Sequence, residues 1–541
     1  MNTNSTIAPR ITAASPIAAL LNTDCYKQAH RAIFEQPNNG DRPSHGDNTG
    51  TTRVLINWTN RSNVYLPGSE HAVVFGVQAF AQEQLTEAWA PFFAADVDEV
   101  CALFEKALLG YFGPNNIGSD HIRALHTLGY LPLKVKALPE GTLAPMGIAT
   151  LTIENTHDAF FWLPNYIETA LSSSIWHPGT VATIAVQYRE LMEAWAEKTG
   201  GDLAAVDFQA HDFSMRGQTS IASATASGAG HLLSFLGSDS MPSVEFVDRY
   251  YPGDNGWVAA SVPATEHSVM CVRGEQGELA TFNAILDAYP TGIVSAVSDG
   301  YDLFKVITEV LPQLHERIMA RDGKLVIRPD SGDPVDIICG EEIGHWEEMS
   351  NIGPVFITED RAGLTPAEKG VIELLDEQFG HTVNGQGYKV LSEKIGLIYG
   401  DSITLDRAKR IFERLADKGY ASTNVVLGIG SYTYQYGVSR DSLGSAVKAT
   451  FAVVDGFDVN IQKDPKTGSG KKSAKGRIVV FRNAAGELEQ YDEATEAQVE
   501  SESLLETVWE DGFFLKHQSF ADVRAMLKSE RAARATRRAA K

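Results

Sequence analysis

The chain has 541 residues, enough for two or more domains with sizeable cores, and its 43% hydrophobic and 21% charged residues are typical of a globular protein. The formal net charge of −23 argues against a general nucleic-acid binder, because phosphate backbones are bound through accumulated Lys and Arg. No apolar run approaches the roughly 18 to 20 residues of a membrane span. The four cysteines lie far apart, without the spacing of a disulfide framework or a zinc site, so we expect a cytoplasmic protein.

The first part of the chain is polar and then rich in strand patterns. Residues 1–16 lack the basic region and apolar core of a secretory signal, and residues 36–52 are typical of a polar, mobile loop. Residues 130–153 contain β-branched runs and Pro/Gly turns without helical periodicity, as do residues 447–491. Because chain ends often lie together, we expect these two stretches to form halves of one antiparallel, β-rich domain.

From about residue 200 the chain alternates short β-branched runs with helical patterns, which indicates a parallel α/β architecture. The expected strands are residues 205–210, 243–247, 292–297, 325–328, 395–399 and 424–427, and the helices between them include 220–235, 301–320, 366–378 and 405–418. We therefore predict an α/β fold with an irregular (β/α) barrel at 181–445. The β-rich domain then comes from residues 17–180 and 446–541.

Polar and glycine residues follow the ends of these predicted strands. In a (β/α) barrel the active site lies at the carboxyl ends of the strands and is built from the following loops, so one cleft should contain all of these groups. They are His211-Asp212, Ser298-Asp299, Arg328-Pro329-Asp330, Gly400-Asp401 and Gly428-Ile429-Gly430.

Positive charge is concentrated in a Gly/Ser-containing segment at 463–477 with six Lys and Arg residues. It is either a solvated loop or a cationic arm that closes on a small polyphosphate, and the acidic remainder of the chain favours the arm. A second basic stretch, 528–541, has the pattern of a solubilising helical tail.

Glu266 and His267 stand together in Ser-Val-Pro-Ala-Thr-Glu-His-Ser at 261–268. An imidazole beside a carboxylate can act as a general base or accept a phosphoryl group, although a lone Glu-His pair is more often structural. Asp330 and Asp333 are hard oxygen ligands suited to Mg²⁺ or to ribose hydroxyls, but they are also ordinary turn formers. Arg328 beside them favours a pyrophosphorylated sugar.

The segment Gly428-Ile-Gly-Ser431 offers backbone amides to a phosphate where barrels often bind one. It has neither the Rossmann nor the Walker spacing. A flat heteroaromatic substrate would need stacking partners, and Phe213 and Tyr26 are the candidates, although by composition alone such residues more often belong to the core.

Together these motifs resemble the nicotinamide phosphoribosyltransferase family of NAD salvage, over nearly the whole chain. The resemblance implies a type II phosphoribosyltransferase fold and a Mg²⁺-dependent homodimer with shared active sites. Such an enzyme joins nicotinamide to 5-phosphoribosyl 1-diphosphate, with ATP as co-substrate. Phe213 and a partner's Tyr26 would stack the ring, Arg328 and Asp239 would hold the carboxamide, and His267 would accept phosphate from ATP.

The resemblance also implies the remaining contacts. Ribose and phosphate would be bound by Asp330, Gly400, Asp401, Gly430, Ser431 and Arg216, with Ser261, Ser295, Asp299 and Glu266 around them. The diphosphate would be bound by Arg61, Arg440, Lys448, Lys463, Lys471 and Arg477. Segment 337–386 is longer than is usual in this family, and the glycine turn reads Gly-Ile-Gly-Ser.

Three other functions fit the sequence less well. A nicotinate phosphoribosyltransferase is disfavoured because Asp239 would repel a carboxylate substrate. A metal-dependent barrel aldolase or hydrolase would need a Schiff-base lysine or a His-rich cluster at the strand ends. A nucleic-acid binder using the 463–477 arm conflicts with the acidic total charge.

Overall fold

The computed structural model describes residues 15–36, 50–253, 256–342, 344–349, 353–358, 363–400, 402–463 and 473–539. The chain forms two compact units. Unit 1 contains residues 1–180, 248–253 and 439–541, and unit 2 contains 181–247 and 254–438. The boundary at 180/181 falls inside the 37-residue helix α6 (Leu163–Thr199).

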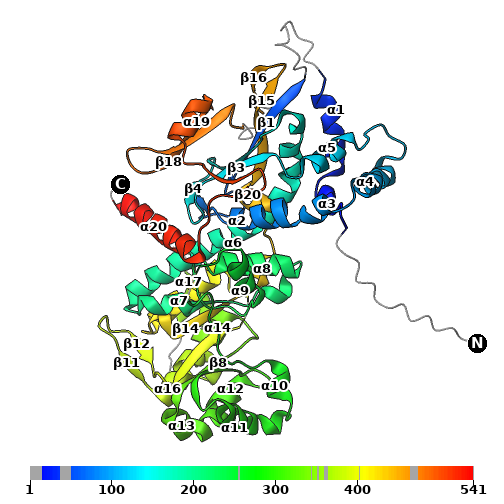
Figure 1. The fold of residues 1–541 in the computed structure, drawn as a ribbon. Helices are drawn as coiled ribbons and strands as arrows, with labels where there is room; N and C mark the ends of the chain where they lie inside the picture. Colours follow the sequence, from blue (N-terminus) through cyan, green and yellow to red (C-terminus); the bar gives the residue numbers. More distant parts are fainter. Residues whose placement is uncertain are drawn as a thin grey trace, which may run out of the picture. The chain divides into compact units, whose positions relative to one another are not determined.

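Unit 1 is built on a seven-stranded antiparallel sheet in the order β16-β15-β1-β5-β3-β19-β20. Strands from the two ends of the chain share this sheet: β1 pairs with β15 from Thr51↔Val454 to Thr59↔Ala446 (Figure 1). The expected β-rich domain from N- and C-terminal segments is therefore confirmed. The sheet strands are β1 (Thr51–Thr59), β3 (Leu133–Ala137), β5 (Ala149–Asn155), β15 (Ala446–Val454), β16 (Phe457–Asn460), β19 (Glu506–Glu510) and β20 (Phe513–Phe514).

Two smaller antiparallel pairs and several helices complete unit 1. The pairs are β2 (His71–Val73) with β4 (Leu143–Pro145), and β17 (Arg477–Arg482) with β18 (Leu488–Ala494). The core between sheet and helices contains Trp89, Phe92, Phe104 and Trp509. The helices are the first half of α6 together with α1 (His30–Phe34), α2 (Val77–Gln82), α3 (Ala90–Ala94), α4 (Val97–Phe112), α5 (Asp120–Leu128), α19 (Glu496–Glu502) and α20 (Phe520–Ala539).

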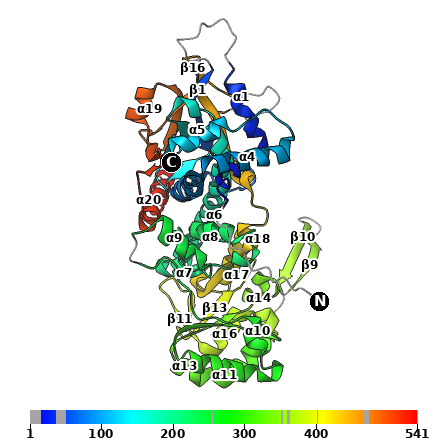
Figure 2. The same cartoon turned by 45° about the vertical axis from the view of Figure 1, so that its right-hand side comes forward.

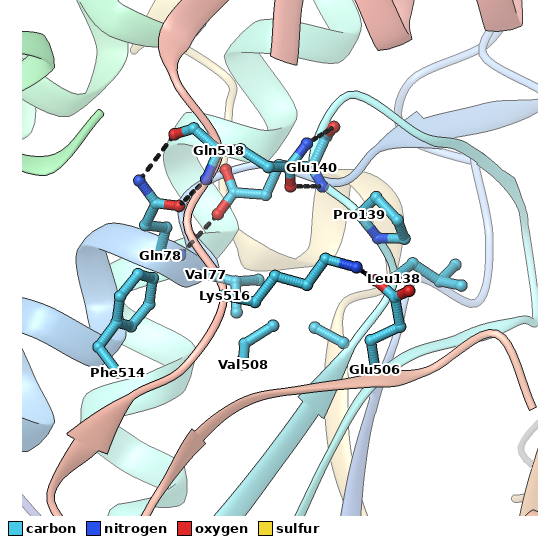
Figure 3. A pocket seen from close by; sticks show the side chains of 11 residues that line it. Val77, Gln78, Leu138, Pro139, Glu140, Glu506, Val508, Phe514, Lys516 and Gln518 are labelled. Atoms are coloured by element: carbon cyan, nitrogen blue, oxygen red, sulfur yellow. Dashed lines mark hydrogen bonds and ion pairs between the residues drawn. The ribbon is translucent and has the colours of Figure 1, made fainter. Parts of the chain in front are cut away.

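The C-terminal segment is attached to the N-terminal part of unit 1 by two amide side chains (Figure 3). Gln518 Oε1 accepts the Glu140 N–H at 2.7 Å, and its Nε2 donates to the Glu140 carbonyl at 3.1 Å. Gln78 in turn accepts the Gln518 N–H at 2.9 Å and donates to the Gln518 carbonyl at 3.0 Å. The Gln78 amide thus binds the backbone of Gln518, and the Gln518 amide binds the backbone of Glu140. Both contacts lie immediately before α20 begins.

Helix α20 packs directly on the backbone of the turn before β4. A Cβ on Gly141 would lie 2.3 Å from the Val523 carbonyl oxygen, and Gly141 has a φ of +88°. Only glycine fits both the left-handed conformation and this contact. A helix was predicted for the basic stretch 528–541. The observed helix begins earlier than that stretch, at Phe520, because its first turns bury apolar side chains in the core.

Unit 2 contains a parallel five-stranded sheet in the order β6-β14-β13-β8-β7. Isolated parallel bridges continue it beyond both edges. Asp212 of β6 pairs with Ser238, Gly237 pairs with Ala260, and Ala264 pairs with Ser295 of β7. The segment 260–264 therefore joins the two edges into the expected irregular barrel. The strands are β6 (Ala210–Asp212), β7 (Thr291–Val297), β8 (Asp322–Arg328), β13 (Ile395–Tyr399) and β14 (Val425–Ile429).

Helices surround the barrel strands in unit 2 (Figures 1 and 2). Helices α11 and α13 lie side by side, joined by an ion pair between Arg317 and Asp287. Two hairpins also occur here, β9 (Gly344–Met349) with β10 (Gly353–Thr358), and β11 (His381–Val383) with β12 (Lys389–Leu391). The helices are α7 (Val206–Gln209), α8 (Ile221–His231), α9 (Pro242–Tyr250), α10 (His267–Cys271), α11 (Glu278–Ala288), α12 (Leu303–Lys305), α13 (Leu311–Ala320), α14 (Pro334–Cys339), α15 (Pro366–Lys369), α16 (Val371–Phe379), α17 (Leu405–Asp417) and α18 (Ser431–Tyr434).

Two of the predicted strands were wrong. Residues 243–247 lie in helix α9, where Ser243, Phe246, Val247 and Tyr250 are buried at helical spacing after a proline in the first turn. Within residues 205–210, Val206–Gln209 form the short helix α7, and strand β6 begins only at Ala210. The expected helix at 366–378 is interrupted at Gly370, which has a φ of +79°.

No helix in the described ranges is both long and apolar enough to cross a membrane. Residues 37–49 of the predicted polar loop lie outside the described residues, and its last residues, Thr51 and Thr52, already belong to β1.

Candidate active site

The carboxyl ends of the barrel strands bring most of the predicted site residues together in unit 2. Strand β6 leads into Phe213, β7 into Asp299, β8 ends at Arg328 before Asp330, β13 leads into Gly400 and β14 into Gly430. The bridged segments add Asp239 after Ser238, and Glu266 and His267 after Thr265. Parallel strands end at the same rim of a barrel, so these loops line one site.

An aromatic ring and a cation meet at the ends of β6 and β8. The Arg328 guanidinium carbon lies 4.4 Å from the centroid of the Phe213 ring, and the His211 ring centroid lies 4.6 Å from it. A cation over the face of an aromatic ring is a favourable electrostatic contact. The group is therefore suited to a flat, polar aromatic ligand.

Asp239 supplies negative charge to the same group. Its Oδ1 lies 3.4 Å from His211 Nε2 and accepts a hydrogen bond from the Ser261 hydroxyl. Burial alone would raise the pKa of Asp239, but the His211 contact, the Ser261 hydroxyl and the Arg328 charge outweigh it and hold the pKa below its usual 3.8. Asp239 is therefore an ionised acceptor at neutral pH.

His267 opens helix α10 beside β7. Its Nε2 lies 3.4 Å from Asp299 Oδ1, and the other Asp299 oxygen accepts the Asp330 N–H at 2.9 Å. The His267 imidazole is exposed, whereas the Asp299 side chain is buried. The Asp299 carboxylate can therefore orient the His267 ring while the ring remains accessible to a ligand. Glu266, next to it, accepts a hydrogen bond from the Ser268 hydroxyl.

Four buried polar atoms at this rim have no hydrogen-bond partner within the described part of the chain, although two of them, His211 Nε2 and Asp299 Oδ1, have the charged neighbours at 3.4 Å given above. Buried polar atoms are nearly always paired, so a group of unpaired ones indicates a place for a polar ligand. They are His211 Nε2, Ser295 Oγ, Asp299 Oδ1 and Arg328 Nε.

Glycines let side chains of neighbouring loops pack closely at the ends of β13 and β14. A Cβ on Gly400 would lie 2.1 Å from Asp330 Oδ1, and one on Gly217 would lie 2.0 Å from Ser431 Oγ. Arg216 and Ser431 are therefore brought to neighbouring positions, with Arg216 exposed. Asp401 lies outside the described residues.

A second cluster, in unit 1, is cationic. Burial lowers the pKa of Lys448, and the nearby charge of Glu168 opposes that effect. The positive charges of Arg61, Lys463 and Arg440 lower it further. Like charges held together in this way form a site for an anion, because an anion removes their mutual repulsion.

Tyr26 lies near this cluster. The residue is 61% exposed, and its ring centroid lies 5.6 Å from that of His30. Lys27 pairs with Glu168 at 2.7 Å, and the Glu168 charge also acts on Lys448. The Glu168 charge therefore acts both on Tyr26 and on Lys448 of the cationic cluster.

The basic 463–477 arm is only partly described. Lys463 and Ser473 bond to each other at its base, with Ser473 N–H to Lys463 O at 2.9 Å, whereas Lys471 lies outside the described residues. Arg477 is engaged elsewhere in unit 1: it pairs with Asp458 at 3.0 Å and lies 3.7 Å from the Phe451 ring centroid. Its predicted role in diphosphate binding stays a prediction.

The two predicted metal ligands differ in their surroundings. Asp333 Oδ1 accepts the Val335 N–H at 2.9 Å and caps helix α14, whereas Asp330 packs against Gly400. Among the residues that the structure describes, no three His, Cys, Asp or Glu side chains are grouped to hold a metal ion. A Mg²⁺ ion here would need oxygen atoms from the substrate as well, as is common for this ion.

Sequence reasoning did not single out Glu168, or His211 as a contact of Asp239. His211 stood in a quoted motif, but nothing in the sequence shows that its ring faces a residue 28 positions away. Glu168 lies in a long helix without a local motif.

Comparison with known proteins gives consistent matches. A family model described as the nicotinate phosphoribosyltransferase (NAPRTase) family matches residues 208–512. A nicotinamide phosphoribosyltransferase of Acinetobacter baylyi is 42% identical over 520 residues, covering 94% of this chain and 96% of that protein.

This chain belongs to the nicotinate phosphoribosyltransferase family.

A second relative agrees with this, and one solved structure shares the fold. A protein named nicotinamide phosphoribosyltransferase from Xanthomonas campestris is 34% identical over 516 residues, covering 94% of this chain and 97% of that protein. The crystal structure of nicotinate-nucleotide pyrophosphorylase from Pyrococcus furiosus aligns with a TM-score of 0.54 at 14% identity, covering 97% of this chain and 99% of that one. At that identity the likeness concerns the fold alone, a type II phosphoribosyltransferase fold.

Proposed function

We propose that this family member is a nicotinamide phosphoribosyltransferase, which makes nicotinamide mononucleotide and diphosphate from nicotinamide and 5-phosphoribosyl 1-diphosphate. The observation that carries the proposal is the ionised Asp239 beside the Phe213 and Arg328 pair. A carboxylate accepts an amide N–H and repels a carboxylate, so this pocket favours nicotinamide over nicotinate. The names of the two relatives above support the same choice.

In the proposed reaction the ring nitrogen of nicotinamide attacks the anomeric carbon of the sugar. The bond from that carbon to the diphosphate oxygen breaks, and the diphosphate leaves with its electron pair. Phe213 stacks the ring, Asp239 accepts the amide N–H, and Arg328 donates to the amide oxygen. Holding the ring in this orientation lowers the barrier by converting an encounter into a fixed geometry.

The cations of unit 1 are proposed to bind the departing diphosphate. Arg61, Lys448, Lys463 and Arg440 already repel one another, so a polyanion relieves that repulsion as charge develops on it. Asp330 and Asp333 fit Mg²⁺ together with substrate oxygens, and the ion would supply further neutralisation of the leaving group when bound.

ATP is proposed as a co-substrate through His267. The exposed imidazole attacks the γ-phosphorus of ATP, the bond to the bridging oxygen breaks, and ADP leaves. Asp299 stabilises the imidazolium form during this step. Hydrolysis of the phosphohistidine then couples ATP to formation of the mononucleotide.

A homodimer is proposed because Tyr26 is an exposed aromatic residue and lies in one of the segments in which this chain resembles the family. Tyr26 of one copy and Phe213 of the other would stack the two faces of the same ring.

The cytosol stays the expected compartment, because the free cysteines of the described chain fit its reducing conditions.

The test is a product assay on the purified full-length chain. Nicotinamide, nicotinate and quinolinate are each supplied with 5-phosphoribosyl 1-diphosphate and Mg²⁺, with and without ATP, and the mononucleotides are separated and quantified. We expect nicotinamide mononucleotide as the main product and stimulation by ATP. Preferential use of nicotinate or quinolinate would overturn the proposal.

A further inference from the structure

Asp212 is a fully buried carboxylate between the two residues that define the ring pocket. It is 0% exposed and directly precedes Phe213 at the end of β6. Its Oδ1 accepts the Ser214 N–H at 2.9 Å. Its Oδ2 accepts the Ser240 hydroxyl at 2.8 Å and lies 3.5 Å from the Ser238 hydroxyl.

The two serines on Oδ2 are the neighbours of Asp239 on either side. Ser240 N–H also donates to the Ser238 hydroxyl at 3.0 Å, so the loop is closed on itself around Asp239. A backbone hydrogen bond also joins Asp212 to this loop, because the Asp239 N–H donates to the Asp212 carbonyl at 3.1 Å. Asp212 therefore contacts the carboxamide-recognition loop through its side chain and its main chain.

The start of this loop is held from the other side by His231. Burial lowers the pKa of His231, so the imidazole is neutral. Its Nε2 lies 2.9 Å from the Gly237 carbonyl and must donate there, which leaves Nδ1 to accept from the Tyr434 hydroxyl at 2.7 Å. The loop 237–240 is thus fixed at both ends by buried hydrogen bonds.

A buried carboxylate is costly unless it is hydrogen-bonded, and an apolar residue would stabilise the fold as well or better. The use of Asp at this position therefore calls for a further explanation. A carboxylate can only accept, so it forces both serine hydroxyls to point toward it. This locks the backbone of Asp239 relative to Phe213, which follows Asp212 in the chain.

We propose that Asp212 is a positioning residue that sets the selectivity of the ring pocket by holding Asp239 in register with Phe213. The inference rests on the proposed function, since the selectivity in question is for nicotinamide over nicotinate. Asp212 itself is too deeply buried to touch the substrate.

The experiment uses the full chain with two variants, Asp212→Asn and the milder Ser240→Ala. The matched control is Ser243→Ala, because Ser243 is also a buried serine but donates to the Thr225 carbonyl and does not touch Asp212. KM and kcat are measured separately for nicotinamide, nicotinate and 5-phosphoribosyl 1-diphosphate, together with ATP hydrolysis in the absence of a pyridine. Thermal unfolding shows whether each variant is folded.

We expect Asp212→Asn to raise the KM for nicotinamide and to lower the nicotinamide-to-nicotinate ratio of kcat/KM by about tenfold, the size of one lost hydrogen bond to a charged group. Ser240→Ala should shift both in the same direction by about threefold. The KM for the sugar diphosphate and the ATP hydrolysis should stay within about twofold of wild type, and Ser243→Ala should leave the ratio unchanged. If Asp212→Asn does not fold, Ser240→Ala and Ser243→Ala together decide the matter.

An unchanged ratio in Ser240→Ala, or an equal loss for every substrate and for ATP hydrolysis in both variants, would overturn the inference. Failure of the proposed function is seen separately, because the wild-type protein would then not prefer nicotinamide.

Discussion

His267 and Asp299 face each other at the carboxyl rim of the barrel, with 3.4 Å between Nε2 and Oδ1. The other oxygen of the same carboxylate accepts the Asp330 N–H. One side chain therefore links the proposed phosphoryl acceptor to the segment proposed to bind the ribose.

Asp299→Asn should separate ATP use from transfer. The amide cannot stabilise the imidazolium form of His267, so ATP hydrolysis and labelling of the protein from γ-³²P ATP should fall by at least about tenfold. Transfer without ATP should remain within about threefold, because the asparagine oxygen can still accept the Asp330 N–H and other residues hold the ring. The control is Asp287→Asn, whose side chain pairs with Arg317 on the outer helices. Full labelling in Asp299→Asn would contradict the assigned role.

Thr265 should position His267 without touching substrate. Its Oγ1 accepts the Val297 N–H at 2.9 Å. His267 lies two residues after Thr265, and Asp299 lies two residues after Val297, so this hydrogen bond ties the two segments together just before the pair. Thr265→Val keeps the shape but leaves that N–H unpaired, so ATP hydrolysis should fall about tenfold, whereas Thr265→Ser should keep most of it. Equal activity of the Val and Ser variants would show that the hydrogen bond does not matter.

The preference for nicotinamide should not depend on pH near neutrality. Because the pKa of Asp239 lies below its usual 3.8, the carboxylate stays ionised, and the nicotinamide-to-nicotinate ratio of kcat/KM should be flat from about pH 5.5 to pH 8. A lowered folded-state pKa also stabilises the fold above the unfolded-state pKa, and this contribution disappears as the pH falls through the folded value. Asp239→Asn should reduce the ratio by about tenfold or more at each pH. A ratio in the wild type that titrates within this range would assign the selectivity to another group.

Tyr26→Ala and Phe213→Ala should complement each other. Each variant alone should be nearly inactive, since either loses one stacking face. When the two are unfolded and refolded together, about half of the dimers are mixed and each mixed dimer has one intact site, so about a quarter of all sites should work. Activity is compared with the separately refolded variants, and size-exclusion chromatography confirms that dimers form. Dimers without recovered activity would mean that the two residues do not share a site.

Gln518→Ala should destabilise unit 1. It removes two hydrogen bonds to the Glu140 backbone and leaves the buried Glu140 N–H without its acceptor, which together cost about 2 to 3 kcal/mol. Thermal unfolding of the variant should therefore begin at a lower temperature than in the wild type. Gln313→Ala, at an exposed position on α13, removes a single bond to Glu309 O and should change stability by less than about 0.5 kcal/mol. Equal melting temperatures of Gln518→Ala and wild type would show that the two hydrogen bonds between Gln518 and the Glu140 backbone contribute little to stability.

The carboxyl-end residues of the barrel could be predicted from sequence because they follow strands with a clear apolar pattern. Asp299, Arg328 and Gly400 lie where the alternation of strands and helices placed them, whereas Phe213 follows β6, which begins only at the last residue of the strand predicted at 205–210. Residues 243–247 were predicted wrongly because a β-branched run can also form a helix when its buried positions repeat at three and four.

Other features depend on long-range pairing that no local pattern contains. The pairing of β1 with β15 joins segments about 400 residues apart in the chain. Asp212, His231 and Glu168 act through partners from other elements, and their immediate neighbours in sequence give no sign of those contacts.

The segment that closes the barrel also connects the two chemical events proposed for this site, amide recognition and phosphoryl transfer. At one end Ser261 donates to Asp239 in the ring pocket, and five residues on from Ser261 the chain reaches Glu266 and His267. Between them, the ladder through Ala264 and Thr265 fixes the segment to β7. Side chains alternate along an extended segment, so inserting or deleting one residue here would turn its side chains to the opposite face. A single-residue length change between Ser261 and Thr265 would therefore disable amide recognition and phosphoryl transfer at once, although neither set of side chains had been altered.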